Sequence, residues 1–264
     1  MNKNGRIIER HSVGLAMTSS NLLATLERPS QAAVIGASGG IGRAVTEFVA
    51  GEGFEAVHAM SRRDTRSTGG VRTGRINIEH ESSIAAMAEE LRDGAPLRLV
   101  IVATGLLHAA DYQPEKTYRS LDPELLARSF RVNAIGPAMV AKHMLPLLPK
   151  KGKSIFAVIS ARVGSIEDNR LGGWYGYRAS KAALNQLTRT LAVELRRQKP
   201  EAICVALHPG TVDTALSQPF QGGVEGGKLF TPAYAAERML SVLNDLSAAD
   251  SGGFFAWDGQ PIPF

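Results

Sequence analysis

The stretch AAVIGASGGIGR, residues 32–43, decides the fold that this 264-residue chain can adopt. Its first residues are apolar and predict a strand, and the residues from 41 onward predict a helix. Between them Gly36, Gly40 and Gly42 allow a tight turn in which the backbone can approach a diphosphate. The helix that follows would offer free N–H groups and the positive end of its dipole. Glycines also collect in purely structural turns, so the strand before and the helix after are what favour a dinucleotide site.

Outward from this turn, short apolar runs alternate with helical stretches to the end of the chain. This alternation predicts a single α/β domain of the Rossmann type, with a doubly wound parallel sheet of about seven strands and helices on both faces. The further strands are expected at 55–60, 71–78, 97–105, 154–160, 202–210 and 252–257. The helices are expected at 41–53, 81–94, 122–148, 175–198 and 232–247.

Composition excludes several classes of protein. Hydrophobic residues make up 44% of the chain and charged residues 21%, which is typical of an ordinary globular protein. No apolar run reaches the ~20 residues that span a bilayer, so no membrane partner is expected. A net charge of +5 without a basic stripe, and only 6% aromatic residues, argue against nucleic-acid binding. No cluster has metal-ligand spacing, so no metal is expected.

The N-terminal residues and the single cysteine indicate the domain boundary and the cellular compartment. Residues 1–29 are polar and irregular and lack a secretory signal, so a disordered extension is expected there, followed by one domain over 30–264. Cys204 is the only cysteine, which excludes an internal disulfide. A reduced cysteine within an apolar run fits a buried thiol and a cytoplasmic protein.

The end of the second predicted strand indicates which dinucleotide binds. An acidic residue there would hold the adenosine ribose and favour NAD. This chain has Ser61 and Arg62 instead, and a guanidinium can bind a 2′-phosphate through paired hydrogen bonds. Ser38 could add another hydrogen bond. NADP(H) is therefore predicted as the cofactor, with NAD(H) less favoured, although the arginine could also belong to a solvated loop.

The segment GWYGYRASKAALN, residues 173–185, contains two tyrosines and a lysine. Tyr177 and Lys181 are four residues apart and would project from one face of a helix, whereas Tyr175 would not. A free phenol has a pKa near ~10, and a neighbouring ammonium lowers it. The spacing therefore predicts that Tyr177 is a proton-transfer group whose pKa Lys181 depresses.

Together these motifs resemble the short-chain dehydrogenase/reductase family over about residues 32–257. The glycine turn, Asn133 within FRVN, the Tyr177–Lys181 pair and HPGTVDT at 208–214 carry the resemblance. The stretch from 159 to 185 more narrowly resembles Sniffer-type carbonyl reductases and C-factor-like signalling proteins.

The resemblance implies a role for each matching residue. Tyr177 would give its proton to a carbonyl oxygen as hydride arrives from the nicotinamide, and Lys181 would also hold the nicotinamide ribose. Asn133 would bend its helix and hold a water that links Lys181 to solvent. The implied cofactor-binding residues are Gly36, Ser38, Gly40, Ile41, Gly42, Ser61, Arg62, Asn77, Ala103, Gly105, Tyr177, Lys181, Pro209, Gly210, Val212 and Thr214.

One residue of the family pattern is missing. The family places a serine before the catalytic tyrosine to polarise the substrate oxygen, and alignment on Gly164 puts Ala161 there. Ser160 is the preferred replacement and Ser165 the alternative, or no serine serves. Loss of such a hydrogen bond would cost about 2.7–4 kcal/mol at the transition state.

The substrate pocket is expected at the carboxyl end of the fourth predicted strand, 97–105. Leu106, His108 and Trp174 are predicted to line it, and residues 215–231 to form a lid. The expected activity is NADPH-dependent reduction of a small carbonyl compound, or the reverse oxidation of an alcohol. The alternative is a dinucleotide-binding signalling or regulatory protein with little turnover. Family resemblance further implies a homodimer or homotetramer.

Overall fold

The computed structural model describes residues 21–63, 70–223 and 225–264. Within them a seven-stranded sheet has the order β3-β2-β1-β4-β5-β6-β9, and every pair of neighbours is parallel. The predicted α/β fold with about seven parallel strands is confirmed. The strands are β1 (Gln31–Ile35), β2 (Ala56–Ser61), β3 (Val71–Arg75), β4 (Leu97–Val102), β5 (Ser154–Ile159), β6 (Ala202–His208) and β9 (Phe254–Ala256).

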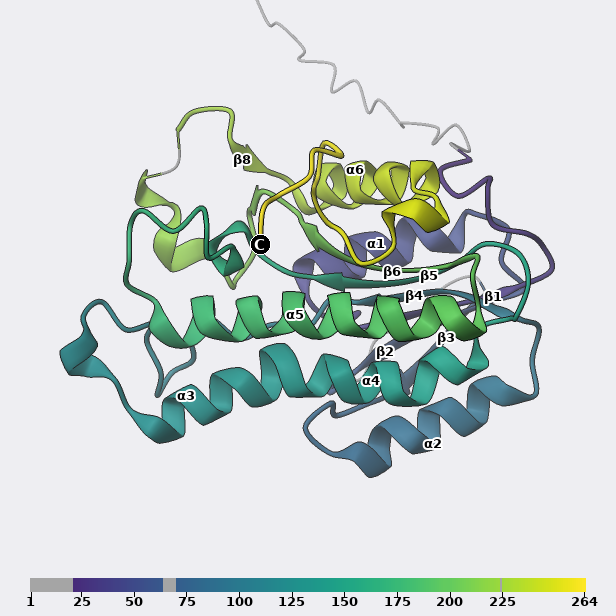
Figure 1. The fold of residues 1–264 in the computed structure, drawn as a ribbon, viewed down its shortest axis with the longest axis horizontal. Helices are drawn as coiled ribbons and strands as arrows, with labels where there is room; N and C mark the ends of the chain where they lie inside the picture. Colours follow the sequence, from purple (N-terminus) through teal and green to yellow (C-terminus); the bar gives the residue numbers. More distant parts are fainter. Residues whose placement is uncertain (1–20, 64–69, 224) are drawn as a thin grey trace, which may run out of the picture.

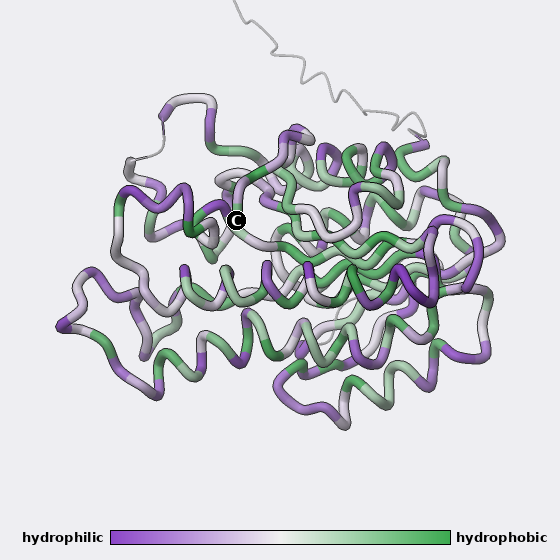
Figure 2. The backbone as a smooth tube through the Cα atoms, viewed as in Figure 1, coloured by the Kyte–Doolittle hydropathy of each residue, from purple (hydrophilic) through white to green (hydrophobic). Residues whose placement is uncertain are grey.

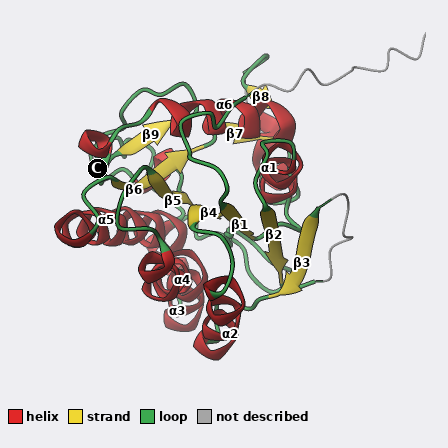
Figure 3. Ribbon diagram, turned by 90° about the vertical axis from the view of Figure 1, so that its right-hand side faces the viewer, coloured by secondary structure: helices red, strands yellow, loops and turns green. Residues whose placement is uncertain are grey.

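Helices cover both faces of the sheet, as the end view shows (Figure 3). Helices α1 (Gly40–Ala50) and α6 (Pro232–Asp245) lie on one face, and α2 (Glu81–Arg92), α4 (Gly136–Met144) and α5 (Tyr175–Gln198) lie on the other (Figure 1). Five neighbouring strands are buried on both faces, which is why each is an almost continuous apolar run: β2, β1, β4, β5 and β6. Hydrophobic residues accordingly concentrate in the middle layer (Figure 2).

The predicted helix over 122–148 is interrupted. Helix α3 (Pro123–Phe130) begins at Asp122, whose carboxylate accepts hydrogen bonds from the N–H groups of Glu124 and Leu125. A π-helical turn, Arg131–Ile135, then separates α3 from α4. Periodicity alone cannot place such a turn, and π-turns occur often at functional sites.

The sheet order reverses direction between β1 and β4. Chain connections run from β1 outward to β3, and from β4 outward to β9. Loops after the two central strands therefore turn away from each other, which leaves a crevice at the carboxyl edge where such sheets bind ligands. The glycine turn follows β1 and residues 103–105 follow β4, so both lie at this crevice.

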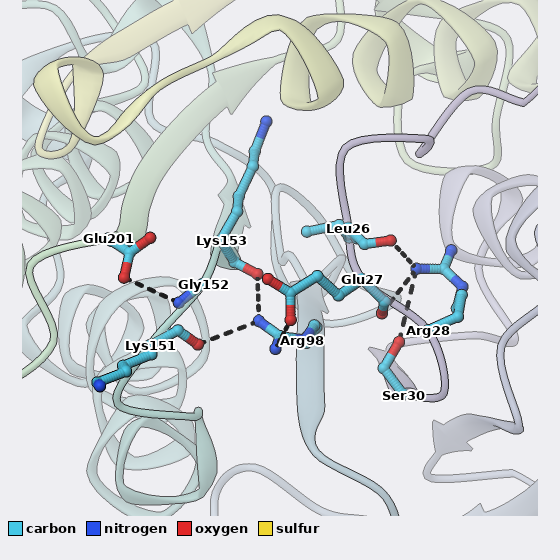
Figure 4. Close-up of polar contacts among 9 residues, drawn as sticks. All are labelled: Leu26, Glu27, Arg28, Ser30, Arg98, Lys151, Gly152, Lys153 and Glu201. Atoms are coloured by element: carbon cyan, nitrogen blue, oxygen red, sulfur yellow. Dashed lines mark hydrogen bonds and ion pairs between the residues drawn. The ribbon is translucent and has the colours of Figure 1, made fainter.

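The opposite, amino edge of the sheet is held by residues 21–30, for which we use the name N-terminal strap. Leu23 and Leu26 are fully buried against α1 and α6, and Glu27 pairs with the buried guanidinium of Arg98. Arg98 also donates to the carbonyls of Lys151 and Lys153, at 3.3 and 2.9 Å (Figure 4). Packing thus begins before the predicted boundary at residue 30. Residues 1–20 of the predicted extension lie outside the described residues.

Candidate active site

The glycine turn after β1 has the geometry of a phosphate-binding loop. Gly36 has φ +93°, a conformation that favours glycine. A Cβ atom at position 42 would overlap the carbonyl oxygen of Gly36, so only glycine fits at position 42. The N–H of Gly36 donates to Met60 O at 2.7 Å, which fixes the loop onto β2. In the described part of the chain, the first-turn N–H groups of α1, on residues 40–42, have no backbone acceptor, and Gly39 at the N-cap has no side chain to supply one. A diphosphate would fit these donors.

Residues 103–105 connect this loop to the predicted catalytic pair. A Cβ atom at Gly36 would lie 2.8 Å from Ala103 O, so the two segments are in close contact. A Cβ atom at Gly105 would lie 3.9 Å from both the Asn133 Oδ1 and the Lys181 Nζ. The glycine turn and Lys181 are therefore brought to the same part of the carboxyl edge.

Tyr177 and Lys181 are both buried and face each other on α5. The Lys181 Nζ lies 5.7 Å from the centre of the Tyr177 ring and donates to Ile159 O at 2.9 Å. Burial lowers the pKa of Lys181 to about 8. Burial also raises the pKa of Tyr177 above its usual value. For the chain by itself, the direction is opposite to the expected depression of the tyrosine pKa, because burial disfavours the charged phenolate.

Asn133 lies in the π-helical turn and holds the segment after β4. Its Oδ1 accepts from the N–H of Leu106 at 2.7 Å, and its Nδ2 donates to Leu106 O at 2.8 Å. The same Nδ2 donates to Ser180 Oγ at 3.0 Å, on α5. Asn133 thus joins the π-turn, the β4 loop and the helix of Tyr177. The backbone of Leu106, rather than its side chain, carries this contact.

The two candidate serines are both engaged elsewhere. Ser160 Oγ donates to the Asn185 Oδ1 at 2.7 Å, so its proton is directed to a buried amide. Ser165 is buried and its Oγ accepts from the N–H of Asp168 at 3.1 Å. Ala161, at the family's serine position, lies two residues after the end of β5, at the start of the short 3-10 turn Arg162–Gly164. Ser160 would have to release Asn185 before it could donate to a substrate.

Aromatic rings form a wall beside Tyr177. The Trp174 ring lies 6.3 Å from the Tyr177 ring and 5.0 Å from Phe220. Phe220 also lies 5.7 Å from His108, whose Nε2 is 3.0 Å from Ala215 O. The predicted pocket residues His108 and Trp174 are thus brought together. Phe220 was not among the predicted pocket residues, because its only signal in the sequence is its place in the predicted lid.

The segment before α5 is held by Arg178. Its Nε donates to Gly172 O and Gly173 O at 3.2 and 3.0 Å, and its Nη1 donates to Val163 O at 3.3 Å. This partial burial lowers the pKa of the guanidinium. Arg178 therefore fixes the loop that presents Trp174, another role that the motif spacing does not reveal.

The end of β2 carries the residues predicted to select the cofactor. Arg62 is 71% exposed and its Nη1 is 3.8 Å from a carboxylate oxygen of Glu79. Asn77 Oδ1 accepts from the N–H of Glu79 at 3.1 Å. Ser61 Oγ donates to the carbonyl of Arg63. A guanidinium that is this exposed, and whose ion pair with Glu79 is long, is accessible to a phosphate.

The turn after β6 and strand β7 (Thr211–Val212) lead into the predicted lid, residues 215–231. Gly210 has φ +78°, and a Cβ atom there would lie 2.6 Å from Phe230. Strand β7 pairs in parallel with β8 (Leu229–Phe230), so the two ends of the lid are joined. A Cβ atom at Gly40 would lie 2.6 Å from Thr214 Cγ2, which brings the lid against the glycine turn.

The sequence model of the short chain dehydrogenase family matches residues 30–223 of this chain. The chain belongs to the short-chain dehydrogenase family. This membership confirms the resemblance drawn from the motifs. As a short-chain dehydrogenase, the protein is an oxidoreductase of a family that uses nicotinamide dinucleotides.

Individual relatives cover most of this short-chain dehydrogenase. The C-signal of Myxococcus xanthus is 38% identical over 141 residues, which cover 53% of this chain and 78% of the C-signal. The 1-hydroxy-2-glutathionyl-2-methyl-3-butene dehydrogenase of Rhodococcus sp. strain AD45 is 29% identical over 229 residues, with 86% and 96% coverage. The crystal structure of an NADPH-bound carbonyl reductase from chicken fatty liver has 28% identity and a TM-score of 0.77, and the match covers 90% of this chain and 100% of that one.

Among the residues that the structure describes, no helix combines the length and apolarity needed to span a membrane. Over the same residues, no group of three or more His, Cys, Asp and Glu side chains is arranged to hold a metal ion.

Proposed function

We propose that this short-chain dehydrogenase is an NADP(H)-dependent reductase of a small carbonyl compound, with Tyr177 as the proton donor. The observation that carries the proposal is the contact chain across the carboxyl edge. Residues 103–105 touch the glycine turn on one side and lie beside Lys181 on the other. A dinucleotide held by the turn would therefore extend toward Tyr177.

The residues around the crevice suit an NADP(H) molecule. The first-turn N–H groups of α1 would hold the diphosphate, and Arg62 with Ser38 would hold the 2′-phosphate. Lys181 has a single hydrogen-bond acceptor among the described residues, so its remaining N–H groups are available to ribose hydroxyls. The segment Pro209–Thr214 would hold the nicotinamide end. The bound cofactor supplies hydride, and the chain supplies orientation and a proton.

The state of Tyr177 favours the direction of reduction. Because burial raises its pKa, the phenol keeps its proton at neutral pH and can donate it to a carbonyl oxygen. Oxidation would instead require the phenolate. The Trp174, Phe220 and His108 rings would form one side of the substrate site and exclude water from it.

The test combines binding with turnover. The purified protein is titrated with NADPH and NADH by nicotinamide fluorescence, and NADPH oxidation is measured over aldehydes, ketones and quinones. We expect tighter binding of NADPH, turnover of at least one carbonyl class, and a loss of about 10²–10⁴-fold in kcat for Tyr177→Phe. Tyr175→Phe is the matched control, because Tyr175 is partly exposed on the same helix turn. Turnover that survives Tyr177→Phe would exclude the proposed proton donor.

A second candidate is a dinucleotide-binding signalling protein with little turnover. Two observations favour it: the 38% identity to the C-signal over 141 residues, and the engagement of Ser160 with Asn185. Tight NADPH binding without turnover of any carbonyl class would support this candidate instead. A cytoplasmic location and a homodimeric or homotetrameric state stay predictions, which fractionation and light scattering would test.

A further inference from the structure

Helix α5, which carries Tyr177 and Lys181, begins without a cap of its own. Trp174 occupies the N-cap in a left-handed conformation, with φ 51° and ψ 44°, and its side chain accepts no hydrogen bond. The first turn of this 24-residue helix contains no acidic residue. Its N-terminal N–H groups therefore need acceptors from elsewhere in the fold.

Glu115, about 60 residues earlier in the chain, supplies two of these acceptors. Its backbone carbonyl accepts from the N–H of Trp174 at 2.5 Å, and its carboxylate Oε2 accepts from the N–H of Gly176 at 3.1 Å. A carboxylate at a helix N-terminus also interacts favourably with the helix dipole. Glu115 is only 3% exposed, so this contact is shielded from solvent.

The close approach requires a glycine on the helix. A Cβ atom at position 176 would lie 2.9 Å from the Glu115 Oε1 and 3.3 Å from the Tyr112 hydroxyl. The Oε1 is itself buried without a hydrogen-bond partner in the described part of the chain. A buried carboxylate oxygen without a partner costs stability, so its presence in the fold needs an explanation. The second oxygen and the backbone of Glu115 hold residues 174 and 176, on either side of Tyr175 and directly before Tyr177.

We propose that Glu115 is a positioning residue, which fixes the first turn of α5 so that Trp174 and Tyr177 present their rings to the substrate site. This role rests on the proposed function for its effect on turnover, but the contact itself can be tested without turnover. Glu115 acts through α5 and touches neither the substrate nor the cofactor.

The first test compares Glu115→Ala and Glu115→Gln, with Glu124→Ala as the matched control on the exposed start of α3. Glu115→Ala should lower kcat by about 10–100-fold, since small misplacements of reacting groups have effects of this size. Its Kd for NADPH should stay within about twofold, because the glycine turn is not altered. Glu115→Gln keeps an acceptor for Gly176 and should restore most of kcat, whereas a loss as large as that of Glu115→Ala would contradict the proposal.

The second test introduces the missing Cβ from the helix side. Gly176→Ala should lower kcat and the melting temperature in the wild-type background, where the methyl group meets the Glu115 carboxylate. In the Glu115→Ala background the same substitution should cost clearly less, because the 2.9 Å contact is gone and alanine favours the helix, while the contacts at 3.3 Å with the Tyr112 hydroxyl and Leu126 Cδ2 remain. Equal effects of Gly176→Ala in both backgrounds would show that residues 115 and 176 are not coupled, since coupled residues must give a nonadditive double-mutant cycle.

The third readout is the emission of Trp174 in a Trp257→Phe background. We expect Glu115→Ala to shift this emission and Glu124→Ala to leave it unchanged. A Glu115→Ala variant with wild-type emission, melting temperature and kcat would overturn the proposal. If no carbonyl compound is turned over by any variant, the proposed function fails, while the emission and the melting-temperature cycle still decide the role of Glu115.

Discussion

Two buried lysines, one at each edge of the sheet, show how similar chemistry serves different ends. Lys199, at the amino edge, donates to the carbonyls of Leu145, Pro146 and Leu148, which uses all three of its N–H groups. Lys181, at the carboxyl edge, donates only to Ile159 O within the described residues. The Lys199 ammonium holds the end of a helical segment and has no N–H group left for a ligand. The Lys181 ammonium still has N–H groups that can bind a ligand. The number of hydrogen bonds that each lysine makes within the fold therefore distinguishes the supporting edge from the reacting edge.

Replacement of Lys181 by methionine should have the largest effect. We expect Lys181→Met to lower kcat/KM by about 10²–10³-fold, because the cation beside Tyr177 and the cofactor site is removed. Its free energy of unfolding should change by less than ~1 kcal/mol, since a single hydrogen bond is lost. NADPH oxidation and urea denaturation measure the two quantities. A large loss of stability with normal turnover would show that Lys181 supports the fold and takes no part in the reaction.

The matched substitution at the other edge should give the opposite pattern. Lys199→Met would leave three carbonyls without their donor, at a cost of about 3 kcal/mol in the free energy of unfolding. The folded variant should bind NADPH with wild-type affinity. If Lys199→Met weakened cofactor binding more than it weakened the fold, the two edges would not be separate in function.

The pair between the N-terminal strap and Arg98 should matter less. Glu27→Gln removes one charge from a pair in which the Glu27 side chain is 63% exposed and the Arg98 side chain 8% exposed. Arg98 keeps the carbonyls of Lys151 and Lys153, and solvent screens the lost charge, so we expect a loss of about 1 kcal/mol. Denaturation at low and high salt tests this, and a loss that salt does not reduce would argue against an ion pair.

The pH dependence tests the charge of Lys181 without a substitution. Charged Lys181 binds the nucleotide better, so binding raises its pKa from about 8 and takes up a proton. NADPH affinity should therefore weaken as pH rises through 8, at most ~tenfold per pH unit. Conversely, the free protein gains stability from this group as pH rises from about 8 toward 10.5, because the unfolded chain then binds more protons. NADPH titrations at pH 7–9.5 should show an affinity that falls with rising pH, and Lys181→Met should remove this pH dependence. If the pH dependence of the affinity is unchanged in Lys181→Met, another group causes it.

The sequence predicted the sheet and the glycine turn because both depend on local pattern. Buried parallel strands require apolar runs, and the turn requires glycines at fixed spacing, so neither needs knowledge of distant residues. The same holds for the shared helical face of Tyr177 and Lys181. Their pKa values could not be predicted, because these depend on how deeply α5 is packed against the sheet.

The parts that were missed depend on contacts between distant segments. Glu115 reaches Gly176 across 61 residues, and Phe220 reaches Trp174 across 46. The engagement of Ser160 by Asn185 likewise needs two elements placed side by side. Spacing within one segment cannot report such contacts, so the supporting residues of a site are harder to predict than its reacting groups.

Strands β7 and β8 hold the two ends of the lid together, so a break in the backbone between them would not release either end. The portion after the lid contains α6, which packs into the core against α1, and β9, which pairs with β6. The protein should therefore assemble from two separately synthesised polypeptides divided after Gly223. Such a split protein would report its own assembly through nucleotide binding, because the second polypeptide places Pro232 beside Gly40 of the glycine turn and pairs its β8 with β7 of the first.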